Sequence, residues 1–147
     1  MFERRMMAGW ADMDFNSHMA NTAFLGKAAD VRMLFLAENG YPMSEFRRLH
    51  IGPVVMKDEL SYYREVALLE QITVTLALAG LSEDGSRWQL RSEIFRGDGK
   101  LAARIDSVGG WLDLTARKLV TPSPALLATW RSLYQTDDHQ VLPSSVR

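Results

Sequence analysis

The sequence has no cysteine, almost no net charge and no long apolar run. Without cysteine there is no disulfide framework, thiol nucleophile or thiolate metal site, which is compatible with a cytoplasmic protein. The 17 Lys and Arg residues nearly balance 18 Asp and Glu residues, so we expect no nucleic-acid partner. No stretch approaches the roughly 18 apolar residues of a membrane span, and no signal-peptide core follows the charged start at Glu3 to Arg5. We therefore expect no membrane partner and a cytoplasmic location.

The length and apolar content of the chain suffice for one domain. A chain of 147 residues, of which 47% are apolar, can bury about two-thirds of its unfolded surface. No repeat, linker or low-complexity tract interrupts the chain before its C-terminus. We expect a single domain over residues 1–134, followed by a polar and flexible tail over residues 135–147.

The clearest helix is predicted over Thr22–Glu38, where apolar residues cover nearly the whole circumference. A helix of this kind is expected to be buried on most sides. Gly40 and Pro42 end it. Five strands of one chain give limited cover, and a second subunit is one way to supply the rest. Shorter helical segments are predicted over Ser44–Leu49 and Ala125–Tyr134.

Further along the chain, apolar residues recur at every second position, which is typical of strands with one buried face. Asp84-Gly85 and Asp98-Gly99 supply the turns between three such segments. The glycines at 109 and 110 indicate a bend or a close backbone approach. The expected strands are Glu3–Ala11, Gly52–Arg64, Ile72–Leu78, Trp88–Ile94 and Leu101–Leu112. Their order predicts an α+β fold in which a five-stranded antiparallel sheet wraps around one long helix.

The densest polar cluster lies between the first strand and the long helix. It contains two carboxylates, two amides, a serine and a histidine, namely Asp12, Asp14, Asn16, Ser17, His18 and Asn21. Helix capping by Asn16, Ser17 or Asn21 is one interpretation. A calcium loop is excluded because its sixth position is Ser17 rather than Gly and its twelfth is Ala23 rather than Glu.

Other catalytic centres find little support in the sequence. The three histidines lie far apart, so no metal site is expected. There is no G-x-S-x-G elbow for a serine nucleophile. A carboxylate such as Asp14 beside a helix start can act as base or nucleophile while free N–H groups polarise a carbonyl. This chemistry suits a thioester, because a thiol of pKa near ~8.5 leaves without a strong general acid.

At this cluster the sequence resembles the hotdog-fold acyl-CoA thioesterases of the 4-hydroxybenzoyl-CoA thioesterase type. That family has an Asp-x-Asp-x-x-Gly-His-x-Asn-Asn-like stretch, and here the corresponding residues are Asp12-Met13-Asp14-Phe15-Asn16-Ser17-His18-Met19-Ala20-Asn21. The resemblance spans Glu3 to Leu126. Further matching positions are Arg32, Gly40, Ile51 to Val55, Tyr63-Arg64, Asp98-Gly99, Ala102-Ala103 and Lys118.

The resemblance implies a hotdog fold and an acyl-CoA thioesterase that works as a homodimer or homotetramer. Asp14 would attack the thioester or activate water, a backbone N–H near Asn21 would polarise the carbonyl, and His18 would help to place substrate or water. CoA would enter as part of the substrate, with no separate cofactor. Candidates for binding its phosphates are Arg64, Arg117 and Lys118, each of which could equally be an ordinary surface charge.

Three positions depart from the family pattern. Ser17 replaces a usual Gly, Ala20 replaces the first Asn of the pair, and Phe24 replaces a common Tyr. The loss of polar groups keeps two alternatives open beside the hydrolase. One is a non-catalytic protein that binds acyl-CoA or an acyl carrier, and the other is a hotdog dehydratase or isomerase.

Overall fold

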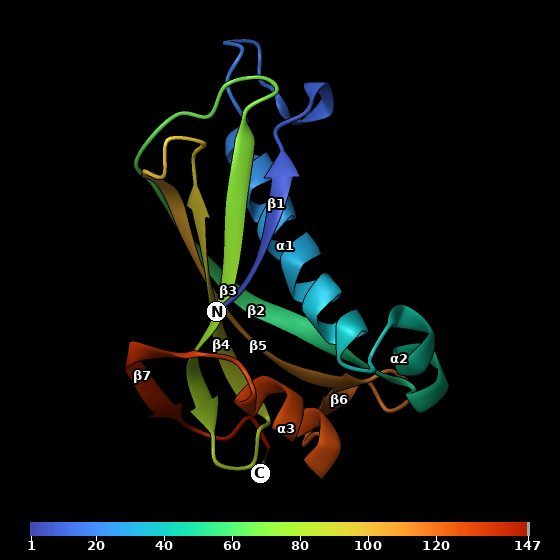
Figure 1. Ribbon diagram of the computed structural model, residues 1–147. Coiled ribbons are helices and arrows are strands. Elements are labelled where there is room, and N and C mark those ends of the chain that lie inside the picture. Colours follow the sequence, from blue (N-terminus) through green and yellow to red (C-terminus); the bar gives the residue numbers. More distant parts are fainter. Residues whose placement is uncertain (147) are drawn as a thin grey trace.

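A curled sheet of seven strands packs against one long helix in the computed structural model, which describes residues 1–146 (Figure 1). Five strands form the main antiparallel sheet in the order β1 (Phe2–Met7), β3 (Gln71–Ser82), β4 (Arg87–Phe95), β5 (Leu101–Asp113) and β2 (Ile51–Tyr62). Two more strands, β6 (Lys118–Val120) and β7 (Gln135–Leu142), pair with β5 and β3. The α+β hotdog arrangement is confirmed, with two strands more than expected.

The helices lie close to the predicted positions. The long helix α1 spans Asn21–Glu38, and Gly40 follows it with a φ of 92°. A 3₁₀ turn, η1, covers Trp10–Asp12, and α2 covers Met43–Leu49. The last helix, α3, spans Pro124–Arg131 and begins at Ser123, whose hydroxyl accepts a hydrogen bond from the N–H of Leu126. No helix among residues 1–146 is long and apolar enough to cross a membrane.

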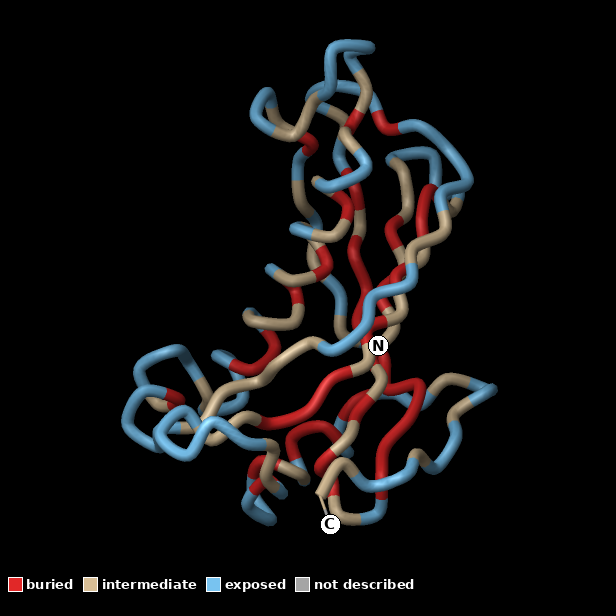
Figure 2. Tube along the Cα trace, turned by 180° about the vertical axis from the view of Figure 1, so that it is seen from behind, coloured by how far each residue is buried: buried red, intermediate tan, exposed pale blue. Residues whose placement is uncertain are grey.

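Helix α1 buries one face rather than most of its sides. The buried side chains are Phe24, Ala28, Val31, Phe35 and Leu36, which face the sheet. Leu34 on the other side is 39% exposed, and Figure 2 shows buried and exposed segments alternating along the helix. The prediction of burial on most sides is therefore wrong for a single chain, because the sheet curls over only one side of α1.

An aromatic cluster forms the core at the end of the sheet farther from the start of α1. Trp88, Trp111 and Trp130 are fully buried, and their ring centroids lie 5.6–6.4 Å apart. Phe35 of α1 stacks on Trp130 at 6.0 Å, which ties α1 to α3. Three large rings of this kind remove a substantial apolar area from water and dominate the packing of such a core.

The close approach expected at the paired glycines is confirmed at Gly109 of β5. A Cβ atom there would lie 2.3 Å from the carbonyl oxygen of Val54 and 2.4 Å from the ring of Trp88. The register between β2 and β5 shifts between Val55 and Lys57, so β2 carries a bulge at this level. The glycine lets β2, β5 and the buried indole pack together.

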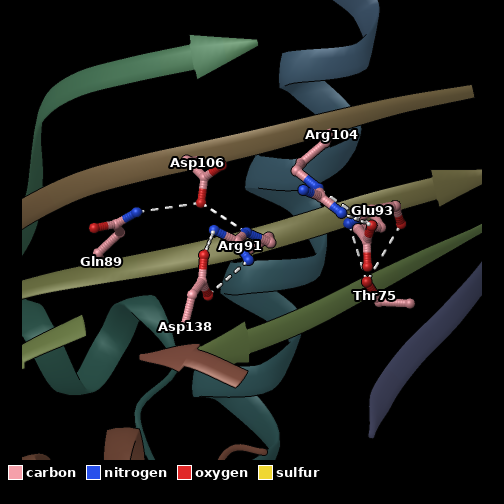
Figure 3. A network of polar contacts seen from close by, with 7 residues as sticks. All are labelled: Thr75, Gln89, Arg91, Glu93, Arg104, Asp106 and Asp138. Carbon is pink, nitrogen blue, oxygen red and sulfur yellow. Dashed lines mark hydrogen bonds and ion pairs between the residues drawn. The ribbon is translucent and has the colours of Figure 1, made fainter. Parts of the chain in front are cut away.

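The expectation of a flexible tail over residues 135–147 is wrong for Gln135–Leu142, which forms β7 and pairs with β3 in parallel. Besides this backbone pairing, a charged side chain holds the strand. Asp138 accepts two hydrogen bonds of 3.0 Å from Arg91, whose Nε donates to Asp106 at 2.9 Å (Figure 3). Beyond the strand, the N–H of Ser145 donates to the hydroxyl of Ser86.

The ion pair between Arg91 and Asp138 is expected to make the stability of the fold depend on pH. The hydrogen bonds from Arg91 lower the pKa of Asp138 from 3.8 to about 2. A depressed folded-state pKa stabilises the fold above about pH 4, and this contribution is lost as the pH falls toward 2. We expect Asp138→Asn to lower the melting temperature at pH 6 and to change it little at pH 2. Thermal unfolding of both proteins from pH 2 to 6 measures this, and a difference that stays constant with pH would contradict it.

Candidate active site

A cavity of about 390 Å³ lies between the loop before α1 and the end of β2 with the segment that follows it. The loop before α1 and the segment after β2 lie at the upper end of Figure 1. The lining of the cavity comes from the polar cluster, the first turn of α1 and the segment that follows β2. The lining residues are Asp14, Asn16, His18, Met19, Asn21, Phe24, Tyr62, Tyr63, Arg64 and Glu65. The fold thus brings together Asp14, His18, Asn21 and Arg64, four of the six candidate site residues.

Asp12 anchors the loop that carries this cluster. One of its carboxylate oxygens accepts the N–H of Gly9 at 2.8 Å and lies 3.0 Å from the ammonium of Lys27 on α1. Burial raises the pKa of Asp12, but the hydrogen bonds and charge of these two partners outweigh it and lower the pKa below its ordinary value. Its carbonyl accepts the N–H of Ala20 at 2.8 Å. Asp12 therefore joins both ends of the loop to the helix.

Asp14 lies in a tight turn that orients its carboxylate. Its N–H donates to the carbonyl of His18 at 2.8 Å, and its Oδ1 accepts the N–H groups of Asn16 at 2.8 Å and His18 at 3.3 Å. Ser17 takes the left-handed conformation, with a φ of 65°, at the position where the family has Gly. Within residues 1–146, no hydrogen bond uses Oδ2 of Asp14, so one carboxylate oxygen faces the cavity region without a partner.

The start of α1 has no side-chain cap. Its N-cap residue is Ala20, which has no polar side-chain atom, and in the described chain neither Asn16, Ser17 nor Asn21 caps it. The carbonyl of Asn21 instead accepts a hydrogen bond from the hydroxyl of Tyr62 at 2.9 Å. The first N–H groups of a helix have no partner within the helix. They are suited to hold a negatively charged oxygen at this end of the cavity.

Backbone contacts join the polar cluster to the segment after β2. The N–H of Met19 donates to the carbonyl of Val66 at 2.8 Å, and His18 forms an isolated antiparallel bridge with Ala67. Nε2 of His18 lies 3.2 Å from a carboxylate oxygen of Glu65. These contacts place a histidine and a second carboxylate on the wall of the cavity that carries Asp14.

Sequence reasoning missed Tyr62 and Glu65, and it named Tyr63 only as a match to the family pattern and not as a site residue. The signal that could have found them was their place at the end of a long strand, directly beside Arg64. Arg64 itself donates to the carbonyl of Leu101 at 2.7 Å and remains exposed. Its guanidinium has five N–H donors, so most of them stay available at the cavity mouth.

The remaining two candidates lie elsewhere. Arg117 and Lys118 follow β5, whereas Arg64 contacts Leu101 at its beginning. A strand of 13 residues spans about 40 Å, so one chain does not bring this pair to the cavity. Among residues 1–146, no three His, Asp or Glu side chains gather into a cluster that could hold a metal ion.

The chain matches one protein family and is similar to many solved structures. The family model of the thioesterase-like superfamily matches residues 8–130. No curated protein sequence matches the chain. Among solved structures, the chain is similar to a hypothetical protein from Staphylococcus aureus in complex with CoA, with 19% identity, a TM-score of 0.83 and coverage of 98% of this chain and 90% of that one.

Two further structures share the fold. A 1,4-dihydroxy-2-naphthoyl-CoA thioesterase from Synechocystis has 14% identity and a TM-score of 0.80, and the match covers 90% of this chain and 96% of that one. A DHNA-CoA thioesterase from Staphylococcus aureus has 15% identity and a TM-score of 0.80, with 88% of each chain covered.

Proposed function

Because the chain belongs to the thioesterase-like superfamily, we propose that it hydrolyses acyl-CoA thioesters with Asp14 as the catalytic carboxylate. One observation carries this proposal: a carboxylate with an unpartnered oxygen and a helix start without a side-chain cap border the same cavity. The Staphylococcus aureus protein solved with CoA supports CoA as the group that presents the acyl chain.

In the proposed reaction, the thioester carbonyl lies between Asp14 and the start of α1. Asp14 takes a proton from a water molecule that adds to the carbonyl carbon. Alternatively, its carboxylate attacks that carbon directly and forms a mixed anhydride, which water hydrolyses after CoA has left, so that the free acid is released and Asp14 is regenerated. The N–H groups near Asn21 stabilise the negative charge that develops on the carbonyl oxygen. The C–S bond then breaks and CoA leaves as thiolate, which its pKa of about 8.5 permits without a strong acid. His18, beside Glu65, is suited to position substrate or water.

The test of this function is release of free thiol from a panel of acyl-CoAs that carry short, long and aromatic acyl groups. Turnover of at least one of them supports the hydrolase. Thermal stabilisation by acyl-CoA without thiol release would instead favour the non-catalytic binding protein. A shifted or new double bond, with the thioester intact, would indicate a dehydratase or isomerase.

We propose that Arg64 binds a CoA phosphate at the cavity mouth. Arg64→Ala is expected to raise KM about tenfold and to leave kcat nearly unchanged, because binding to a remote phosphate is the same in ground and transition states. Arg5→Ala is the control, since Arg5 is exposed on β1, at the edge of the sheet opposite β2, and it should leave both constants unchanged. Steady-state kinetics measure both. A drop in kcat without a change in KM for Arg64→Ala would refute the assignment.

A homodimer is the proposed working form. Within residues 1–146, strand β2 pairs only with β5, so its other edge is free, and Leu34 leaves an apolar side of α1 exposed. A second copy would extend the sheet through β2 and cover this helix, and free edges of this kind otherwise favour aggregation. Sedimentation equilibrium should give twice the mass of the chain, or four times for a pair of dimers. A monomer at micromolar concentration would rule the assembly out.

A further inference from the structure

A second cavity, of about 350 Å³, lies beside the first. Its lining residues are Trp10, Met13, Asp14, Phe15, Ser17 and Leu68. Among the described residues, only Asp14 lines both cavities. The carboxylate proposed to act on the thioester therefore lies at the boundary of two cavities.

The second cavity differs from the first in its chemistry. Tyr62, Tyr63, Arg64 and Glu65 make the first cavity polar and charged. In the second, Ser17 is the only polar lining residue besides Asp14, and the rest is two aromatic rings, a thioether and a leucine. The second cavity favours an apolar group, whose transfer from water to an apolar surface lowers the free energy. A polar group would lose its hydrogen bonds to water there and would find few new partners.

The apolar side chains of this second lining are exposed, on backbone segments that hydrogen bonds fix. Trp10 is 82% exposed, Phe15 is 96% exposed and Leu68 is 38% exposed. The backbone that carries Trp10 and Phe15 is fixed, because Asp12 binds Gly9 and Lys27 and the turn at Asp14 is closed by backbone hydrogen bonds. Leu68 lies in the segment after β2, where the N–H of Leu69 donates to the carbonyl of Ala8 at 2.7 Å. Large apolar side chains clustered on a fixed surface mark a place where another apolar surface binds.

From these observations we propose that Trp10, Phe15 and Leu68 form the acyl-binding surface, and that the thiol arm of CoA occupies the first cavity. This assignment rests on the proposed thioesterase function. It makes the preferred substrates those with a compact apolar acyl group larger than acetyl. Trp10 and Phe15 become the residues that determine specificity, and they come from the same loop as the catalytic carboxylate.

The protein contains a natural reporter for this assignment. Trp88, Trp111 and Trp130 are fully buried, so Trp10 is the indole that acrylamide reaches from solvent. In the Asp14→Asn variant, which keeps the thioester intact, hexanoyl-CoA or benzoyl-CoA should reduce acrylamide quenching at least about twofold, because the acyl group covers the ring. CoA alone should not reduce it. The change should disappear in the double variant that also carries Trp10→Phe. Equal protection by CoA and by acyl-CoA overturns the assignment.

Kinetics give the second test. For Trp10→Ala and Phe15→Ala, kcat/KM for hexanoyl-CoA and benzoyl-CoA should fall at least about tenfold while that for acetyl-CoA stays nearly constant, since apolar contacts discriminate by about this factor. Tyr134→Ala, which removes another half-exposed aromatic ring, is the matched control and should change neither. An equal loss for acetyl-CoA overturns the assignment. A stronger effect on benzoyl-CoA identifies ring stacking, and a stronger effect on hexanoyl-CoA identifies chain packing, and both support it.

The two tests separate this proposal from the function on which it rests. Protection of Trp10 by acyl-CoA in a protein that releases no thiol would refute the hydrolase and support the acyl-binding surface. Thiol release from acyl-CoA without protection of Trp10 would support the hydrolase and overturn the acyl-binding surface.

Discussion

Asp14→Asn is expected to lower kcat for thioester hydrolysis by at least about 100-fold, the range typical of removing a general base. The amide keeps the shape of the side chain, and its oxygen can still accept the N–H groups of Asn16 and His18 that hold the turn. The substitution therefore removes the negative charge while it preserves the loop. KM should change little, because the substrate is held by groups elsewhere in the site. Steady-state thiol release measures both constants.

Asp113→Asn is a closely matched control for this substitution. Oδ1 of Asp113 also accepts two backbone N–H groups, from Thr115 and Ala116, in an exposed turn. These bonds lower the pKa of Asp113 and hold it charged, yet it is the last residue of β5, at the end of the strand away from the cavity. Asp113→Asn should keep wild-type kcat. Full activity of Asp14→Asn, or a similar loss in both variants, would remove Asp14 from the chemistry.

Gly109→Ala is expected to cause the largest loss of stability of any glycine-to-alanine substitution in the sheet. The new Cβ would lie 2.3 Å from the carbonyl oxygen of Val54 and 2.4 Å from Trp88, neither of which is the free end of a flexible side chain. Overpacking typically costs about 1–3 kcal/mol, and contacts this short with backbone and a buried ring place Gly109→Ala at the upper end, about 3 kcal/mol. For a chain of this size, that lowers the melting temperature by roughly 6–12 °C, which thermal and urea unfolding can measure.

Gly26→Ala adds the same methyl group and is expected to stabilise the protein slightly. Gly26 lies inside α1, and no heavy atom lies within 4 Å of the position that its Cβ would take. Alanine in a helix interior is more stable than glycine by about 1 kcal/mol. The melting temperature should therefore rise slightly. If both variants shifted it by the same amount, the close contact at Gly109 would not be the cause.

The long helix and the inner strands follow from local pattern. Thr22–Glu38 was predicted and Asn21–Glu38 is observed, because apolar spacing and Gly40 define the helix within its own sequence. The expected strands at Trp88–Ile94 and Leu101–Leu112 agree with β4 and β5 to within a residue. In these strands one buried face makes apolar and polar residues alternate, and this alternation can be read from the sequence itself.

Strand β7 could not be predicted in the same way. Its sequence, Gln135–Leu142, is mostly polar and shows no apolar alternation. It is held by Asp138, which pairs with an arginine 47 residues away in the sequence, and by parallel pairing with β3. Contacts of this kind depend on the assembled sheet, so the local pattern suggests a flexible tail where the fold has a strand.

Some residues of the candidate site could likewise be grouped from the local sequence, and others could not. Asp14, His18 and Asn21 lie within eight residues of one another, so the sequence alone groups them at the helix start. Arg64 joins them because β2 ends beside that helix start. Arg117 and Lys118 had the right charge, but β5 carries the chain away from the cavity before it reaches them. Charge alone does not specify which end of a strand a residue occupies.

The strand order also bears on how the chain reaches its native state. Strands β3, β4 and β5 are consecutive and are joined by short turns, so this meander can form by closing small loops. The edge strands pair over long distances instead, with Phe2 opposite Leu76 and Ile51 opposite Asp113. Loop closure over such separations is slow and costs entropy before any contact repays it. The helix start and the end of β2, which together form the cavity, are therefore expected to come together late in folding, on a meander that is already in place.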